Sequence, residues 1–167
     1  MLPSPEESQT AVEPPSWLRR KAMDKQLFAD FINATIEVFR FLEAEHDFER
    51  SEAFVHSIEC SIDYTNSTTL LSVTHEGGGQ IWILVSEMTE KGERVPPFYV
   101  LGKLIKRVSP ERERAIDPYY VFDRRSRENL AKNLEAYADF LRKEGRGILK
   151  GDFSLFKPED RLGRPSA

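Results

Sequence analysis

Three consecutive segments in the middle of the chain alternate apolar and polar residues, and this pattern constrains the fold more than any other feature. Strict alternation over several residues is typical of a β-strand with one buried face, because successive side chains point to opposite faces. Turn signals, Asn66-Ser67 and a triple glycine at 77–79, separate the segments. We therefore predict an antiparallel three-stranded meander. Its strands are expected at Ala53–Thr65, Thr68–Glu76 and Gln80–Met88.

The two turns, chosen independently, place the same apolar side chains on one face of this meander. A shift of one residue in either turn would send the whole set to solvent. The other face mixes polar residues with Leu84 and Trp82, so it is either covered by another element or a docking surface. If Asn66-Ser67 is a two-residue loop, Ile62 faces Leu71, Cys60 faces Val73 and Ile58 faces His75. If the three glycines form the next loop, Leu71 faces Val85, Val73 faces Ile83 and His75 faces Ile81.

Helical spacing of apolar residues predicts two long helices and a short one around the sheet. The first long helix is rich in phenylalanine and covers Asp24–Glu45, and the second begins at Ser126 as N-cap and ends near Glu144. The short helix is predicted at Phe98–Val108, and a short strand is possible at Tyr119–Phe122. We therefore expect an α+β fold, with the sheet packed against the two long helices. Four apolar residues should anchor the C-terminal segment: Ile148, Leu149, Phe153 and Phe156.

The length of 167 residues and the 40% hydrophobic content fit a single domain with a real core. We place this domain at residues 17–156, after a disordered or loosely attached tail at 1–16 and before a polar C-terminal tail at 157–167. No stretch approaches the length of apolar sequence that a membrane span needs, and the first fifteen residues lack the pattern of a signal peptide. A cytoplasmic location is the expectation.

The residues that usually carry catalysis or bind metals are scarce. Cys60 is the only cysteine, which excludes an intramolecular disulfide, and between two isoleucines it is expected to be a buried, inert thiol. In the expected register His56 and His75 are diagonal neighbours that could share a ligand or a proton, although two structural histidines are the commoner outcome. The phosphate-loop, dinucleotide-binding, nucleophile-elbow and zinc-protease motifs are absent. We therefore predict no catalytic residue, no metal ligand and no cofactor.

The small net charge of −4 conceals two regions of opposite sign. Residues 1–99 carry 8 basic and 17 acidic side chains, a balance of −9, whereas residues 100–150 carry 13 basic and 8 acidic, a balance of +5. Either both are ordinary solvated surfaces, or the acidic region steers a basic partner and the arginines bind phosphate or carboxylate. The negative total argues against a nucleic-acid binder. The candidate partner-binding residues are Glu43, Glu45, Asp47, Glu49, Glu52 and Trp82, and the candidate anion-binding residues are Arg124, Arg125 and Arg127.

The helix that contains Phe41-Leu42-Glu43, the alternating strands and the segment Ile148–Ser154 together resemble bacterial immunity proteins that neutralise polymorphic toxins, and similar small α+β domains. The acidic composition and order of elements also resemble secretion chaperones, although a clear second pair of strands between residues 109 and 125 is missing. Both classes imply a protein that binds another protein. Neither resemblance rests on a specific motif, so it assigns no role to any residue.

We therefore expect a non-enzymatic domain that binds another protein, as an immunity-type protein through its acidic face or as a chaperone-like protein. The competing class is a small-ligand-binding protein or enzyme that uses His56 and His75 or the arginines at 124–127. A purely structural module is a third possibility. The sequence leaves the identity of the partner and the oligomeric state open.

Overall fold

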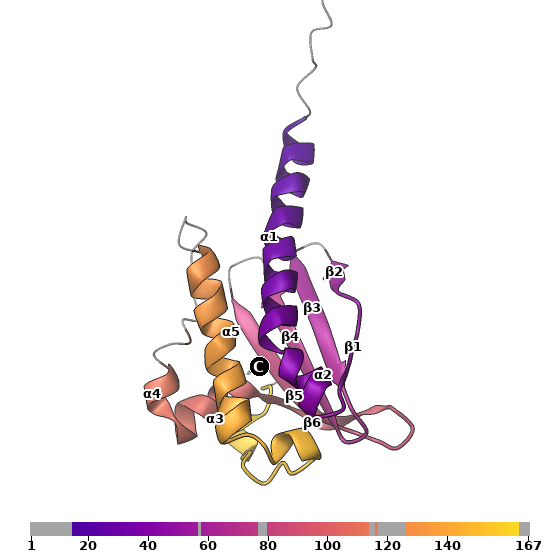
Figure 1. Ribbon diagram of the computed structural model, residues 1–167, viewed down its shortest axis with the longest axis vertical. Coiled ribbons are helices and arrows are strands. Elements are labelled where there is room, and N and C mark those ends of the chain that lie inside the picture. Colours follow the sequence, from indigo (N-terminus) through magenta and orange to yellow (C-terminus); the bar gives the residue numbers. More distant parts are fainter. Residues whose placement is uncertain (1–14, 57, 77–79, 114–115, 117–125, 164–167) are drawn as a thin grey trace, which may run out of the picture.

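The computed structural model describes residues 15–56, 58–76, 80–113, 116 and 126–163, with the backbone alone at 17–27 and 126–128 (Figure 1). It has an α+β fold in which helices flank an antiparallel sheet. The helices are α1 (Ser16–Val38), α2 (Arg40–Glu45), α3 (Leu101–Val108), α4 (Pro110–Glu113), α5 (Ser126–Lys143), η1 (Ile148–Lys150) and η2 (Pro158–Asp160). The strands are β1 (Glu49–Arg50), β2 (Phe54–His56), β3 (Glu59–Thr65), β4 (Thr69–Glu76), β5 (Ile81–Met88) and β6 (Arg94–Val100).

The sheet has the strand order β1-β3-β4-β5-β6, and β2 also pairs with β3 beyond the end of β1. In Figure 1, α1 and α5 lie against each other in front of the sheet and cover one of its faces. The core lies between these two helices and that face. Phenylalanines of α1 meet β4 there, since the rings of Phe28 and Phe31 both contact the imidazole of His75. From α5, Leu130, Leu134, Tyr137, Ala138 and Leu141 are buried in the same core.

The segment predicted as one strand, Ala53–Thr65, is a hairpin. Strand β2 reverses into β3, and Phe54 pairs with Ser61 and His56 with Glu59. Because the reversal takes only two residues and includes no glycine or asparagine, the apolar–polar alternation continues through it. Alternation alone therefore cannot distinguish this hairpin from a longer strand.

The predicted register between β4 and β5 is confirmed, whereas the predicted register between β3 and β4 is wrong by two residues. Leu71 faces Val85 and Val73 faces Ile83, as the glycine turn predicts. Across the other turn the observed pairs are Cys60 with His75, Ile62 with Val73 and Tyr64 with Leu71. The turn is longer than two residues, because the Asn66 side chain accepts hydrogen bonds from the N–H groups of both Thr68 and Thr69. A shift of two residues keeps every side chain on its predicted face.

The helix boundaries differ from the predictions at two places. The helical segment predicted at Asp24–Glu45 begins earlier, at Ser16, and is interrupted at Phe39 between α1 and α2. The start of the helix predicted at Phe98–Val108 is the end of strand β6, and α3 begins at Leu101. Two prolines at 96–97 conceal β6, which an edge strand tolerates. The second long helix is found within one residue of its prediction, at Ser126–Lys143.

The C-terminal segment packs against the domain at several points. Ile148, Leu149 and Phe156 are buried, as predicted for an anchor. Within the predicted polar tail, Leu162 donates its N–H to the carbonyl of Phe98 in β6, and Asp160 forms an ion pair with Arg107. The tail predicted at 1–16 lies outside the described residues up to residue 14, and the short strand predicted at Tyr119–Phe122 lies outside them entirely.

Candidate functional site

The predicted acidic cluster occupies the connection from α2 through β1 to β2. Glu43, Glu45, Asp47, Glu49 and Glu52 are all exposed there. The chain reverses sharply at Asp47, whose φ of +56° lies in the left-handed region that asparagine and aspartate tolerate better than most residues. The buried ring of Phe48 follows and anchors the connection to the core. The cluster is therefore held at a fixed corner of the domain.

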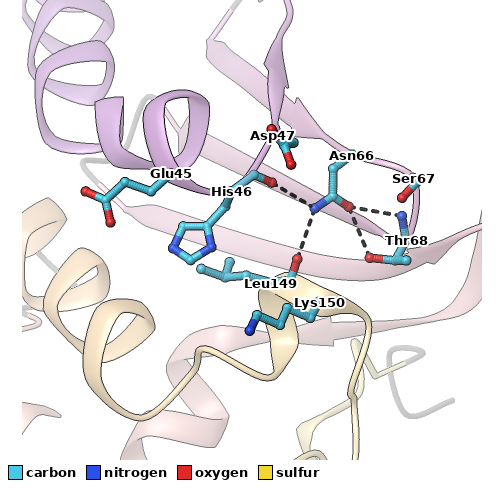
Figure 2. A pocket seen from close by; sticks show the side chains of 8 residues that line it. All are labelled: Glu45, His46, Asp47, Asn66, Ser67, Thr68, Leu149 and Lys150. Carbon is cyan, nitrogen blue, oxygen red and sulfur yellow. Dashed lines mark hydrogen bonds between the residues drawn. The ribbon is translucent and has the colours of Figure 1, made fainter.

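Part of this corner forms the wall of a cavity of about 420 Å³ (Figure 2). Glu45, His46 and Asp47 form one side. The turn between β3 and β4 and the helix η1 complete the lining, with Asn66, Ser67, Thr68, Leu149 and Lys150. Three segments that are far apart in the sequence thus meet here.

Asn66 joins these three segments through its side-chain amide (Figure 2). Its Nδ2 donates to the carbonyls of His46, at 3.3 Å, and Leu149, at 3.0 Å. Its Oδ1 accepts from the N–H of Thr68 at 3.0 Å, from the Thr68 hydroxyl at 3.1 Å and from the N–H of Thr69 at 2.9 Å. Both ends of the amide are thereby used inside the protein, so Asn66 holds the cavity together and has little capacity left for a ligand.

A second depression, of about 320 Å³, adjoins the first and shares Glu45, His46 and Lys150 with it. Arg142 and Arg146, from the end of α5, complete its lining. The lining of the first cavity includes two carboxylates and one lysine, whereas that of the second includes one carboxylate and three cations.

Trp82, the other residue predicted to bind a partner, lies apart from the acidic cluster. It pairs with Thr74 near the beginning of β5, whereas Glu49 pairs with Thr65 at the far end of β3. Its Nε1 is buried and has no hydrogen-bond partner among the described residues. Trp82 lines a smaller, mostly apolar pocket of about 180 Å³ together with Val100 and Tyr137. The structure therefore does not unite Trp82 and the acidic residues in one site.

The predicted anion-binding arginines cannot be placed as a group. Arg124 and Arg125 lie outside the described residues. Arg127 lies in the first turn of α5, and the structure describes only its backbone.

The possible pairing of His56 with His75 is wrong. His75 is fully buried on the core face, opposite Cys60. His56 is exposed on β2, opposite Glu59, and therefore belongs to the other face of the sheet. The unexpected hairpin is the cause, because it turns β2 back along the outer side of β3. The two imidazoles can share neither a ligand nor a proton.

Burial makes the remaining candidates chemically inert. It raises the pKa of the Cys60 thiol to about 11, which disfavours the reactive thiolate. It lowers the pKa of His75 to about 4, so the imidazole is neutral near pH 7. Within the described part of the chain, no three His, Cys, Asp or Glu side chains are grouped in a way that could hold a metal ion.

The hairpin of β2 and β3 forms a surface that the sequence pattern does not predict. Phe54, Val55 and Ile58 are 64%, 52% and 70% exposed, although the apolar–polar alternation predicts Phe54 and Ile58 on the buried face. The rings of Phe54 and His56 stack at a centroid distance of 6.2 Å. A strand of thirteen residues is about twice the usual length of 5–6 residues, and this was the signal that could have revealed the break.

Comparison with known proteins finds no matching family model, no matching curated protein and no matching solved structure. In the part of the chain that the structure describes, no helix has the length and apolar character required to cross a membrane.

Proposed function

We propose that this chain is a non-enzymatic protein-binding domain that contacts its partner through the β2–β3 hairpin and the acidic residues beside it. The observation that carries the proposal is the exposure of Phe54, Val55 and Ile58 on this hairpin, with Phe54 and Val55 on its two opposite faces. Clustered large apolar side chains on the surface are characteristic of interaction sites, since each exposed side chain forgoes about 1.5–3 kcal/mol of burial free energy.

The charges around the hairpin define the partner's chemistry. Glu49 and Glu52 precede it and Glu59 lies within it, and none of the three forms an ion pair with any described residue. Glu43, by contrast, is paired with Arg50 at 3.3 Å. A partner that places an apolar patch on the hairpin and basic residues around it would gain both contact area and long-range attraction. An immunity-type protein that blocks a basic partner fits this description.

The backbone at this edge of the sheet is also available for contact. Ser51 donates its N–H to the carbonyl of Asp63 at 2.8 Å, so the odd-numbered residues of β3 turn their polar groups toward β1 and β2. Val55 opposes Cys60, an even-numbered residue, and its own N–H and C=O therefore point away from β3. An extended segment of the partner could hydrogen-bond there. The cytoplasmic location stays a prediction.

The test is a selection of peptides from a random display library on the full chain, at low and high salt. Selected peptides should combine basic and apolar residues, and raised salt should weaken their binding to the chain. They should lose most of their affinity for the double variant Phe54→Ser/Ile58→Ser and for Glu49→Lys/Glu52→Lys. The matched controls are Leu162→Ser, which removes an apolar side chain that is 51% exposed elsewhere, and Glu90→Lys/Glu93→Lys on the β5–β6 connection.

The proposal would be overturned if the selected peptides bound the hairpin variants as tightly as the unaltered chain. It would equally be overturned if the control variants lost as much affinity as the hairpin variants. Circular dichroism of each variant shows that a loss of binding does not reflect a loss of folding.

A further inference from the structure

Three cations from the C-terminal part of the chain surround the depression of about 320 Å³. Arg142 comes from the last turn of α5, Arg146 follows that helix, and Lys150 belongs to η1. His46 and Glu45 of the α2 end complete the lining. Glu45 is the only carboxylate among the lining residues, so the depression has an excess of positive charge.

The guanidinium of Arg142 is held in place by its surroundings. It lies over the ring of Phe41, 4.3 Å from the centroid, and its Nη2 is 3.4 Å from the carbonyl oxygen of Val38. On the other side its Nη1 lies 3.7 Å from a carboxylate oxygen of Glu135. Arg142 thus provides a fixed, partly compensated positive charge at the wall of the depression.

Arg146 and Lys150 supply the uncompensated charge. Arg146 donates through Nε to the carbonyl oxygen of Arg142 at 2.6 Å, which orients the guanidinium. Neither its two Nη groups nor the Lys150 ammonium has a hydrogen bond or ion pair with any described residue. Figure 2 shows the Lys150 side chain and the His46 ring on the same side of η1. Donors from separate segments therefore line one depression with no partner among the described residues.

A simpler explanation accounts for only part of this arrangement. Basic residues at a helix C-terminus are stabilising because they complement the helix dipole, which explains Arg142 and Lys143. It does not explain Lys150, which belongs to another element, or why the cations line a concave surface.

We propose that this depression binds the phosphate group of a small phosphorylated molecule. An arginine guanidinium offers two parallel N–H donors to phosphate oxygens, and a lysine ammonium adds a compact charge. Because the cations outnumber the carboxylate at the depression, a doubly charged oxyanion gains more net attraction there than a singly charged carboxylate does. The adjoining cavity of about 420 Å³ gives the remainder of the ligand a polar surface at Ser67 and Thr68. This site is separate from the hairpin and does not depend on the proposed function.

The experiment is isothermal titration of the full chain with pyrophosphate, inorganic phosphate and acetate at constant ionic strength. Pyrophosphate should bind more tightly than phosphate, and acetate should not bind. Arg146→Gln/Lys150→Gln should weaken pyrophosphate binding by about tenfold or more, since two charge-assisted contacts are lost. Glu45→Gln should strengthen it, because the substitution removes the only carboxylate among the described residues that line the depression.

The control is Lys91→Gln/Lys132→Gln, which changes the net charge equally at two exposed lysines that do not line the depression. It should leave the affinity within about twofold. Two results would overturn the proposal: no binding of pyrophosphate by the unaltered chain up to roughly millimolar concentrations, or equal losses in the control and in Arg146→Gln/Lys150→Gln.

Discussion

At the scale of single residues, Asn66 contributes most to the shape of the candidate site. Its amide makes five hydrogen bonds to three segments, and four of the partner groups are backbone atoms. We expect Asn66→Ala to lower the free energy of unfolding by about 2 kcal/mol, since it leaves several partly buried backbone groups without partners. Urea denaturation would measure the loss.

The neighbouring Ser67→Ala provides the control, because Ser67 is exposed and makes no hydrogen bond with any described residue. Its unfolding free energy should stay within about 0.5 kcal/mol of the unaltered chain. Equal effects of the two substitutions would show that the amide does not hold the three segments together.

His75 makes the stability of the domain depend on pH. Burial lowers its pKa from 6.5 to about 4, so the unfolded chain binds a proton that the folded chain does not. The contribution of His75 to the free energy of unfolding is therefore complete above pH 6.5 and is lost as the pH falls from there toward 4. Between pH 7 and 4.5 we expect a loss of about 2–3 kcal/mol from this residue.

The measurement compares the urea-unfolding free energies of the unaltered chain, His75→Phe and His75→Gln at both pH values. The titration of acidic residues changes the unfolding free energy of all three proteins alike. A smaller pH dependence in the two variants therefore measures the contribution of the His75 imidazole. Two variants are used because one replacement can disturb the packing against Phe28 and Phe31. An unchanged pH dependence in both would contradict the account of His75.

At the scale of elements, η1 ends against the β3–β4 turn in a close contact that requires glycine. Gly151 has a φ of +86°, and a Cβ at this position would lie 2.8 Å from the Cβ of Thr68. Thr68 has little room to move, because its hydroxyl is hydrogen-bonded to Asn66. We expect Gly151→Ala to cost about 3 kcal/mol, from backbone strain together with the steric clash.

Gly92 is the matched comparison for this prediction. Its φ is +76°, but no atom of the described residues lies within 4 Å of a Cβ placed there. Gly92→Ala should therefore cost about 1 kcal/mol, from backbone strain alone. Thermal or urea denaturation of the two variants separates the cost of backbone strain from the cost of the steric clash. Equal losses of unfolding free energy would show that the contact with Thr68 is unimportant.

The elements also show which parts of the fold the sequence can determine. The β4–β5 register follows from a glycine turn and the positions of apolar residues. The β3–β4 register does not, because the side chain of Asn66 lengthens that turn. The β2–β3 reversal has no turn signal, and β6 is hidden by Pro96 and Pro97 because proline disfavours a strand assignment.

The candidate site was predictable only in part, for a similar reason. The acidic residues and their exposure follow from local composition, and their place at the α2–β1 corner follows from the order of the elements. The exposure of Phe54 and Ile58 depends on the concealed pairing of β2 with β3. The convergence of Arg146, Lys150 and His46 depends on tertiary packing between segments about 100 residues apart, which periodicity does not encode.

At the scale of the whole molecule, the two edges of the sheet differ. At the β6 edge, Leu162 donates its N–H to the Phe98 carbonyl, and Arg161 forms a bridge with Tyr99. At the opposite edge β3 is the only described strand that pairs with β1 and β2, and β2 is exposed at all three residues. Proteins usually protect an edge strand or use it for binding. We infer that the covered edge is protected and that the open edge is the binding surface.

The most direct test of this inference is site-specific photo-crosslinking in the cells that make the protein. A photoreactive amino acid replaces Phe54 or Ile58 in the hairpin, or Leu162 as a comparably exposed apolar control. We predict a covalent adduct with another protein from the two hairpin positions, diminished by Glu49→Lys/Glu52→Lys, and no such adduct from position 162. Absence of an adduct from the hairpin, or the same adduct from position 162, would contradict the central claim that the open edge binds the partner.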